Sequence, residues 1–301
     1  MIGAVHVVVR NKRNSYDFTL WRNITLLQGD SGTGKTTLYE MIRAYSDSGN
    51  DNSGVKITCD KNIVVLEGQS WEEQLENLRN SIVVIDEGSK FILSSDFASK
   101  VKGSDNYFLI ITRNDLIQLP YSVDEIYHIK GKGKNKAFER SYKDVDRFYN
   151  QPNLEGFPFY PKVIITEDSG SGYQFFAEVA KMAGILCKPA GGKAKIAAVL
   201  KEYESDNVII VADGAALGSE IKYFVMRQER SHGKLALFFP ESFEWLILKS
   251  GIVGDPNIEE LEHPENYADS KKYISWEPYF TDLLCNRTAD YEYMRYKKNH
   301  L

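Results

Sequence analysis

The sequence predicts an α/β protein with two units that follow each other along the chain. Three observations predict this. A glycine-rich loop near residue 29 lies between a strand-like and a helix-like segment, continuous apolar runs typical of strands covered on both faces occur at 82–85 and 108–111, and a second strand–helix alternation begins near residue 161. A chain of 301 residues also exceeds the ~100–200 residues that are common for one domain. We expect a mostly parallel sheet in each unit.

The first unit is predicted to cover residues 1–150 and to hold most of its strands before residue 112. Apolar alternation, apolar runs and turn residues give the individual elements. The predicted strands are 2–10, 15–20, 24–28, 55–59, 62–66, 82–85 and 108–111, and the predicted helices are 35–45 and 70–79. Two further short strands, 126–129 and 137–142, are expected at the edge of this sheet.

Residues 151–160 are predicted to be a linker, because the stretch 148–158 contains two prolines, a glycine and several amides without a helical or strand period. The second unit, 161–250, then repeats the α/β pattern. Its predicted strands are 163–165, 208–211 and 235–239, and its predicted helices are 173–183, 193–203 and 217–228. Residues 251–301 are expected to form a helical extension whose aromatic residues favour packing onto the domain over stacking on nucleic acid.

Composition and charge restrict the class of protein. A formal net charge of -5 argues against a protein that coats nucleic acid through bulk positive charge, although a local basic patch escapes this count. The three cysteines, Cys59, Cys187 and Cys285, are too far apart for a CxxC metal site and do not suggest a disulfide framework. The first residues show no leader-like pattern, and no apolar run approaches the ~20 residues needed to span a bilayer. We expect a cytoplasmic protein that does not enter membranes.

The strongest motif reads Gly-Asp-Ser-Gly-Thr-Gly-Lys-Thr over residues 29–36, between a predicted strand and a predicted helix. Phosphate binding needs backbone N–H groups that converge on an anion, and glycines allow the chain to curl around it. Lys35 is expected to reach the β- and γ-oxygens of a nucleoside triphosphate, and the Thr36 hydroxyl to bind Mg²⁺. The predicted nucleotide-binding residues are Gly29, Asp30, Ser31, Gly32, Thr33, Gly34, Lys35, Thr36 and Thr37.

A second motif belongs with this loop, because the apolar run 82–85 ends in Asp86 and Glu87. It resembles the Walker B motif of P-loop ATPases that carry an additional catalytic glutamate. The resemblance implies that Asp86 binds Mg²⁺ through water and that Glu87 polarises the water attacking the γ-phosphate. ATP and Mg²⁺ are therefore the expected cofactors, with ATP preferred over GTP by resemblance.

The run 108–111 ends in Thr112, Arg113 and Asn114, where related ATPases carry a polar sensor of the γ-phosphate. Thr112 or Asn114 can serve as this sensor. Arg113 can pair with an acid or reach a neighbouring subunit, and an ordinary polar strand end is an equal alternative.

Acidic residues also follow the strands of the second unit. Glu167 comes after the strand 163–165 and Asp213 after the strand 208–211, at the strand ends where ligands gather in open α/β sheets. Between them lies the glycine turn 191–193. Two such carboxylates can converge on one Mg²⁺ that activates water or steadies a phosphodiester leaving group. The alternative is an α/β domain whose acids only cap strands and helices.

Residues 161–248 resemble the TOPRIM domains of topoisomerases, primases and overcoming-lysogenization-defect nucleases. The first glutamate of this family corresponds to Glu167, its glycine turn to 191–193, and the first acid of its Asp-x-Asp pair to Asp213. The second acid is absent, since that position is Ala215, and Glu241 or Glu244 can supply a replacement. The resemblance implies Glu167 and Asp213 as catalytic residues and a metal site formed by Glu167, Asp213 and Glu244. Within the turn, Lys193 either contacts a phosphate or begins a helix.

Together these motifs resemble the ATPase-nucleases of prokaryotic defence. The leading expectation is an ATPase whose nucleotide state controls a Mg²⁺-dependent activity on nucleic acid. A nucleotide-switched interaction protein with an inactive second domain is one alternative, favoured by Ala215. A motor or assembly ATPase similar to zonula-occludens-toxin-like phage proteins, with Arg113 acting between subunits, is another. The expected partners are ATP, DNA or RNA, and further copies of the chain or another protein.

Overall fold

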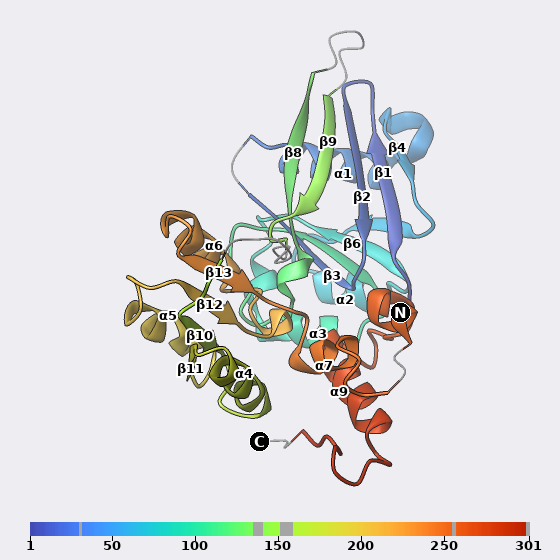
Figure 1. Cartoon of the computed structure of the whole chain (residues 1–301). Coiled ribbons are helices and arrows are strands. Elements are labelled where there is room, and N and C mark those ends of the chain that lie inside the picture. Colours follow the sequence, from blue (N-terminus) through green and yellow to red (C-terminus); the bar gives the residue numbers. More distant parts are fainter. Residues whose placement is uncertain (30–31, 135–140, 151–158, 255–256, 299–301) are drawn as a thin grey trace. The chain divides into compact units, whose positions relative to one another are not determined.

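The computed structural model of the chain describes residues 1–29, 32–134, 141–150, 159–254 and 257–298 (Figure 1). These residues form an α/β protein with a large mixed sheet, a smaller parallel sheet and accompanying helices, which confirms the predicted α/β class. The chain divides into two compact units: Met1–Phe148 with His263–Ile274, and Tyr149–Glu262 with Ser275–Leu301.

The first unit contains a nine-stranded sheet, counted over the described residues, in the order β4-β1-β2-β9-β8-β3-β7-β6-β5. Its strands are β1 (Val5–Arg10), β2 (Asn14–Leu20), β3 (Ile24–Gln28), β4 (Lys56–Thr58), β5 (Asn62–Val65), β6 (Ser81–Ile85), β7 (Tyr107–Ile111), β8 (Ile126–Lys134) and β9 (Ser141–Arg147). Every residue of β3, β6 and β7 is buried, as continuous apolar runs in a covered parallel sheet should be.

This sheet is mixed, although five of its eight described strand pairs are parallel, in line with the predicted mostly parallel sheet. The pairs β1·β2, β1·β4 and β8·β9 are antiparallel, whereas β8-β3-β7-β6-β5 is a continuous parallel part. The predicted edge position of 126–129 and 137–142 is wrong. β8 and β9 lie inside the sheet, because β8 pairs with β3 and β9 pairs with β2 (Figure 1). Residues 137–140 of the predicted strand lie outside the described residues.

Three α-helices are described in the first unit: α1 (Lys35–Ser53), α2 (Trp71–Glu76) and α3 (Ser95–Lys102). α1 continues beyond its predicted end to Gly54, whose φ of 66° is left-handed and ends the helix. α3 was not predicted from the sequence. The Ser94 side chain accepts a hydrogen bond from Phe97 N, and Phe97 and Val101 of this helix are buried.

The segment 263–274 returns to the first unit, although it belongs to the predicted helical extension of the second. Gly3 N donates to Glu265 O at 2.7 Å, Ser270 N donates to Met1 O at 3.0 Å, and the Met1 ammonium pairs with Asp269. These contacts join residues far apart in the sequence and produce no periodic pattern, so the return was not foreseeable from hydrophobic period.

The second unit contains a parallel sheet of four described strands in the order β11-β10-β12-β13, as expected for its α/β pattern. Its strands are β10 (Val163–Thr166), β11 (Leu186–Pro189), β12 (Val208–Val211) and β13 (Leu235–Phe238), and its helices are α4 (Ser171–Met182), α5 (Lys193–Lys201), α6 (Ile221–Arg230), α7 (Phe243–Lys249), α8 (Ile258–Glu262) and α9 (Trp276–Arg287). β11 was missed because it is a short edge strand without an apolar run. Residues 151–158 of the predicted linker lie outside the described residues.

The register of this sheet brings three strand ends to one edge. Thr166, the last residue of β10, pairs with Val211 of β12, and Val211 pairs with Phe238 of β13. The residues that follow these strands therefore meet at the carboxyl edge. Over the described part of the chain, no helix is long and apolar enough to cross a membrane.

Candidate functional site

The glycine loop of the first unit has the backbone that anion binding requires. Gly29, Gly32 and Gly34 have φ angles of 123°, 80° and 110°, which residues with a Cβ rarely adopt. The loop runs from the buried strand β3 directly into α1, whose N-terminal N–H groups carry partial positive charge. Asp30 and Ser31 of the predicted loop lie outside the described residues.

Side chains from other strands hold this loop in place. Tyr16 of β2 donates from its hydroxyl to Gly34 O at 2.9 Å, and Lys143 of β9 donates from Nζ to Thr33 O at 2.8 Å. A Cβ on Gly34 would lie 2.9 Å from the Tyr16 oxygen, so the position requires glycine on steric grounds as well. Burial raises the pKa of Tyr16 to about 12, although a hydrogen bond with Thr37 opposes the rise. Tyr16 therefore remains a neutral donor.

The side chain of Lys35 is buried and lies along the loop, donating to Gly29 O at 2.6 Å and to Thr33 Oγ1 at 3.3 Å. A cavity of about 210 Å³ is lined by Gly32, Gly34, Lys35, Thr36, Thr37, Glu87, Ile111 and Arg113. The structure thus brings five of the predicted nucleotide-binding residues and the predicted catalytic Glu87 to one cavity.

Glu87 is held by an ion pair inside this cavity. Arg113 Nε lies 3.0 Å from Glu87 Oε2, and Arg113 Nη2 lies 3.3 Å from Glu87 Oε1. Of the alternatives for Arg113, the structure shows pairing with an acid. Thr112 is buried and its hydroxyl accepts from Asn114 N at 3.0 Å, so Thr112 stabilises the turn after β7.

Asp86 does not line the loop cavity. It borders a neighbouring cavity of about 600 Å³ together with Tyr39, Arg43 and Glu67. Tyr39 donates to Glu67 Oε2 and Arg43 pairs with Glu67 Oε1, both at 2.9 Å. The predicted magnesium ligands Thr36 and Asp86 therefore face different cavities in this structure.

In the second unit, Glu167 and Asp213 follow adjacent strands and line the same cavity of about 400 Å³. Glu167 N donates to Val211 O at 3.1 Å, which extends the pairing of β10 with β12 by one residue. The glycine turn packs beneath Glu167, because Gly192 N donates to Glu167 O at 2.8 Å. Lys193 begins α5, and its ammonium contacts Ala216 O and Glu220 instead of the cavity.

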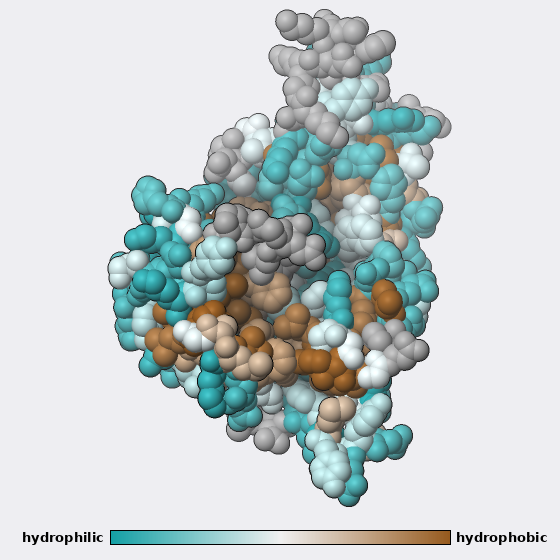
Figure 2. Space-filling view, in the orientation of Figure 1, coloured by the Kyte–Doolittle hydropathy of each residue, from teal (hydrophilic) through white to brown (hydrophobic). Residues whose placement is uncertain are grey.

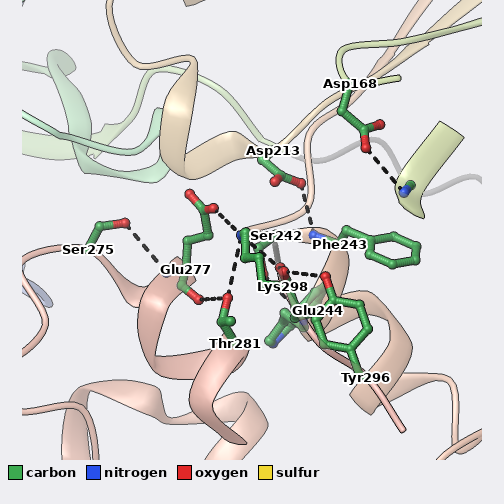
Figure 3. Close-up of polar contacts among 12 residues, drawn as sticks. Asp168, Asp213, Ser242, Phe243, Glu244, Ser275, Glu277, Thr281, Tyr296 and Lys298 are labelled. Atoms are coloured by element: carbon green, nitrogen blue, oxygen red, sulfur yellow. Dashed lines mark hydrogen bonds and ion pairs between the residues drawn. The ribbon is translucent and has the colours of Figure 1, made fainter. Parts of the chain in front are cut away.

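Glu244 also lines this cavity, whereas Glu241 is not among the described lining residues. Glu244 lies in the first turn of α7, whose start is fixed when Ser242 Oγ accepts from Trp245 N at 3.2 Å. In the same turn, Phe243 N donates to Asp213 Oδ1 at 2.9 Å (Figure 3). The turn therefore sets the positions of both acids.

Residues from the C-terminal part of the chain complete the cavity (Figure 3). Lys298 Nζ lies 3.0 Å from Glu244 Oε1 and 2.6 Å from Glu277 Oε1, and Tyr296 donates its hydroxyl to Glu244 Oε1 at 2.9 Å. Glu277 is in the first turn of α9. Lys298 thus lies between two of the five carboxylates that line the cavity, which are Glu167, Asp168, Asp213, Glu244 and Glu277.

The electrostatics of the cavity follow from this excess of acids. Burial raises the pKa of Glu167 to about 7, although a backbone hydrogen bond from Asp213 opposes the rise. Burial, then the charges of Glu277, Glu244 and Glu167, raise the pKa of Asp213 well above its ordinary value. For Glu244, burial is opposed by Lys298 and Tyr296, and the net effect lowers its pKa. Carboxylates with raised pKa values gain most from a cation that enters their site.

Asp168, the neighbour of Glu167, stabilises the start of α4. Its carboxylate accepts hydrogen bonds from Gly170 N, Gly172 N and Tyr173 N at 3.0–3.2 Å, which caps the start of α4 (Figure 3). A Cβ on Gly172 would lie 2.9 Å from Asp168 Oδ1, so this glycine allows the carboxylate to approach.

The acids of the cavity fit a hard divalent cation in chemistry, since carboxylate oxygens are the ligands that Mg²⁺ prefers. Glu167 Oε2 and Glu244 Oε2 are buried and have no hydrogen-bond partner among the described residues. Within the same residues, no three Asp, Glu, His or Cys side chains are already grouped as a metal site. Glu167 Oε2 and Glu244 Oε2 are therefore oxygens of this cavity that can take a further contact.

Sequence reasoning missed several residues of both sites: Tyr16 and Lys143 at the loop, and Glu277, Tyr296 and Lys298 at the acidic cavity. The first two lie on strands in ordinary alternating patterns, and the last three lie in a segment interpreted as packing aromatics. The run of Tyr and Lys residues at 291–298 was the one available signal. No protein-family model matches this chain, and no curated protein matches it either.

Proposed function

We propose that the first unit binds and hydrolyses ATP with Mg²⁺, and that its nucleotide state controls a Mg²⁺-dependent, TOPRIM-like cleavage of nucleic acid by the second unit. The observation that carries the proposal is the convergence of Glu167, Asp213 and Glu244, from separate segments, on one cavity at the carboxyl edge of a parallel sheet. The resemblance to ATPase-nucleases of prokaryotic defence favours a role against foreign nucleic acid.

At the loop, the backbone N–H groups of residues 32–36 and the Lys35 ammonium would bind the phosphates, and Thr36 would hold Mg²⁺. Asp86 borders the neighbouring cavity and would reach this Mg²⁺ through water. The Glu87 carboxylate would accept a proton from the attacking water. Its pairing with Arg113 at 3.0 Å keeps it in the same cavity as Lys35. Arg113 is also placed to contact an anionic phosphate in that cavity.

At the acidic cavity, Glu167, Asp213 and Glu244 would hold Mg²⁺, which when bound supplies Lewis acidity toward a phosphodiester. Lys298 contributes a positive charge next to Glu244, at 3.0 Å, and can face the phosphate. Burial raises the pKa of Glu167 to about 7 without the cation, and a bound Mg²⁺ would keep this carboxylate deprotonated.

A second candidate is a nucleotide-switched interaction protein whose second unit binds a partner without cleavage. Ala215 favours it, since the second acid of the Asp-x-Asp pair is missing. The surface of α4 also favours it, because Val179 and Met182 are 46% and 89% exposed and Figure 2 shows apolar surface over this helix.

Incubation of purified protein with single- and double-stranded DNA and RNA, Mg²⁺ and ATP tests the proposal. We expect cleavage that falls more than about 100-fold in Glu167→Ala, because the cation site loses a ligand. Lys35→Met should remove the response to ATP, and Glu178→Ala, an exposed acid on α4, should change neither. Cleavage that persists in Glu167→Ala would contradict the assignment. If no substrate is cleaved but the protein captures a partner in an ATP-dependent manner, the second candidate is favoured.

A further inference from the structure

The ammonium of Lys298 has two acidic partners that differ in their surroundings. Glu244 is almost fully buried, with 2% of its side chain exposed, whereas 28% of the Glu277 side chain is exposed. Glu244 Oε2 is buried and has no partner among the described residues. The helical turn that carries Glu244 also donates a backbone hydrogen bond to Asp213. Glu244 is therefore the partner that an entering cation would take.

Glu277 is anchored apart from the other acids. It lies at the start of α9, where Ser275 Oγ accepts from Glu277 N at 3.4 Å. Thr281, one turn further along the helix, donates to Glu277 O at 3.0 Å and lies 3.5 Å from Lys298 Nζ. α9 thus presents a carboxylate and a hydroxyl to the same ammonium, independently of the strand ends (Figure 3).

We propose that Glu277 is a positioning residue that keeps the Lys298 ammonium in the acidic cavity when Glu244 turns to a bound cation. The inference rests on the proposed function, which supplies the cation. The two ion pairs of Lys298 are present without a cation. It assigns the segment 275–298 to the working site of the second unit and not to a packing extension.

The physical reason is electrostatic. A divalent cation and an ammonium a few ångströms apart repel each other strongly in a partly buried cavity, and lysine has a flexible four-carbon stem that can leave. When Glu244 binds the cation, a second carboxylate must balance the charge of the Lys298 ammonium. Glu277 at 2.6 Å provides it, and the cavity then presents two positive centres to a phosphodiester.

The acylation of Lys298 by an amine-reactive reagent, followed by mass spectrometry, tests this inference in the whole 301-residue chain. Lys297 is exposed and next in sequence, so it serves as an internal reference. Without metal, we expect Lys298 to remain protected in wild type, in Glu244→Gln and in Glu277→Gln, because one carboxylate remains. The double variant should label about tenfold faster. Amide exchange of α9 reports whether each variant is folded.

With saturating Mn²⁺, whose binding is followed separately by electron paramagnetic resonance, wild type should keep Lys298 protected. Glu277→Gln should label about tenfold faster only when Mn²⁺ is bound. Two results would overturn the inference. One is that, without metal, Lys298 in Glu244→Gln is labelled as fast as in the double variant. The other is that Lys298 in wild type becomes labelled when Mn²⁺ binds. If Mn²⁺ does not bind at all, the proposed cation site fails, while the metal-free comparison still decides whether Glu277 alone holds Lys298.

Discussion

The glycine loop of the first unit and the acidic cavity of the second are built on opposite principles. The loop uses contiguous residues, and its geometry comes from backbone angles such as the φ of 110° at Gly34. The acidic cavity uses side chains that come from β10, β12, α7, α9 and the C-terminal segment, brought together by the tertiary fold. A local motif therefore identifies the first site, whereas the second exists only once its unit has folded.

The two sites also differ in how they hold charge. The ion pair of Glu87 with Arg113 is exposed, with 37% and 57% of the side chains accessible, and water can solvate either partner if the other is lost. Glu244 is buried beside Lys298 and its pKa is lowered, whereas the pKa values of Glu167 and Asp213 are raised. We therefore expect substitutions at the acidic cavity to change stability, and substitutions at the loop to change mainly ligand binding.

The largest effect is expected for Lys298→Met. This substitution removes the ammonium that pairs with the buried Glu244. Removing one partner of a buried ion pair lowers the unfolding free energy by about 3 kcal/mol. Urea unfolding followed by hydrogen exchange of the β10 and β12 amides measures this in the second unit. Lys201→Met, at the exposed end of α5, is the matched control, and an equal loss of stability in both variants would contradict the account.

The next effect is a pH dependence that Glu167 causes. Its folded pKa of about 7 lies above the ordinary value of 4.5, so the folded state favours the protonated acid and stability falls as pH rises from about 4.5 to 7. The fall is at most about 3 kcal/mol, from 1.36 kcal/mol for each pKa unit.

Glu167→Gln should lack this dependence and should gain stability over wild type as pH rises through that range. Unfolding of both proteins at pH 4.5 and pH 7.5 measures the difference, and Glu178→Gln is the exposed control. A constant difference between wild type and Glu167→Gln across this range would show that Glu167 is not buried as described.

At the loop, Lys35→Met is expected to weaken ATP binding about 10- to 100-fold, the loss of a charge-assisted contact to phosphate. The unfolding of the second unit should not change. Calorimetric titration with ATP and Mg²⁺ measures the affinity, and Lys12→Met, a surface substitution away from the loop, is the control. Unchanged affinity would remove Lys35 from the nucleotide site.

The smallest effect is expected for Arg113→Ala, which should alter the unfolding free energy by less than about 1 kcal/mol because its pair with Glu87 is exposed. Thermal unfolding of the protein without nucleotide measures it. A larger loss would mean that this ion pair is a structural element, and the contrast between the two sites would be weaker.

The sequence was sufficient where local residues determine the structure. The apolar runs at 82–85 and 108–111 became the buried strands β6 and β7, and the glycine loop led into α1 at Lys35. It was insufficient where pairing is nonlocal. β8 lies between β3 and β9, although nothing in its own residues distinguishes an interior strand from an edge strand.

The same rule applies to the candidate sites. Glu167, Asp213 and Glu244 were predicted because each follows a recognisable strand, and the structure places them around one cavity. Glu277 and Lys298 were not, since their proximity depends on how α9 and the segment after it fold back onto α7. Their ion pairs at 2.6 and 3.0 Å are a tertiary property with no sequence period.

The central claim is that the acidic cavity of the second unit binds a divalent cation. Anomalous diffraction from a crystal soaked in Mn²⁺ tests it most directly. We expect a peak in contact with the carboxylates of Glu167, Asp213 and Glu244 that disappears in Glu167→Ala crystals. An ordered cavity without such a peak, at a Mn²⁺ concentration that supports activity, would contradict the account.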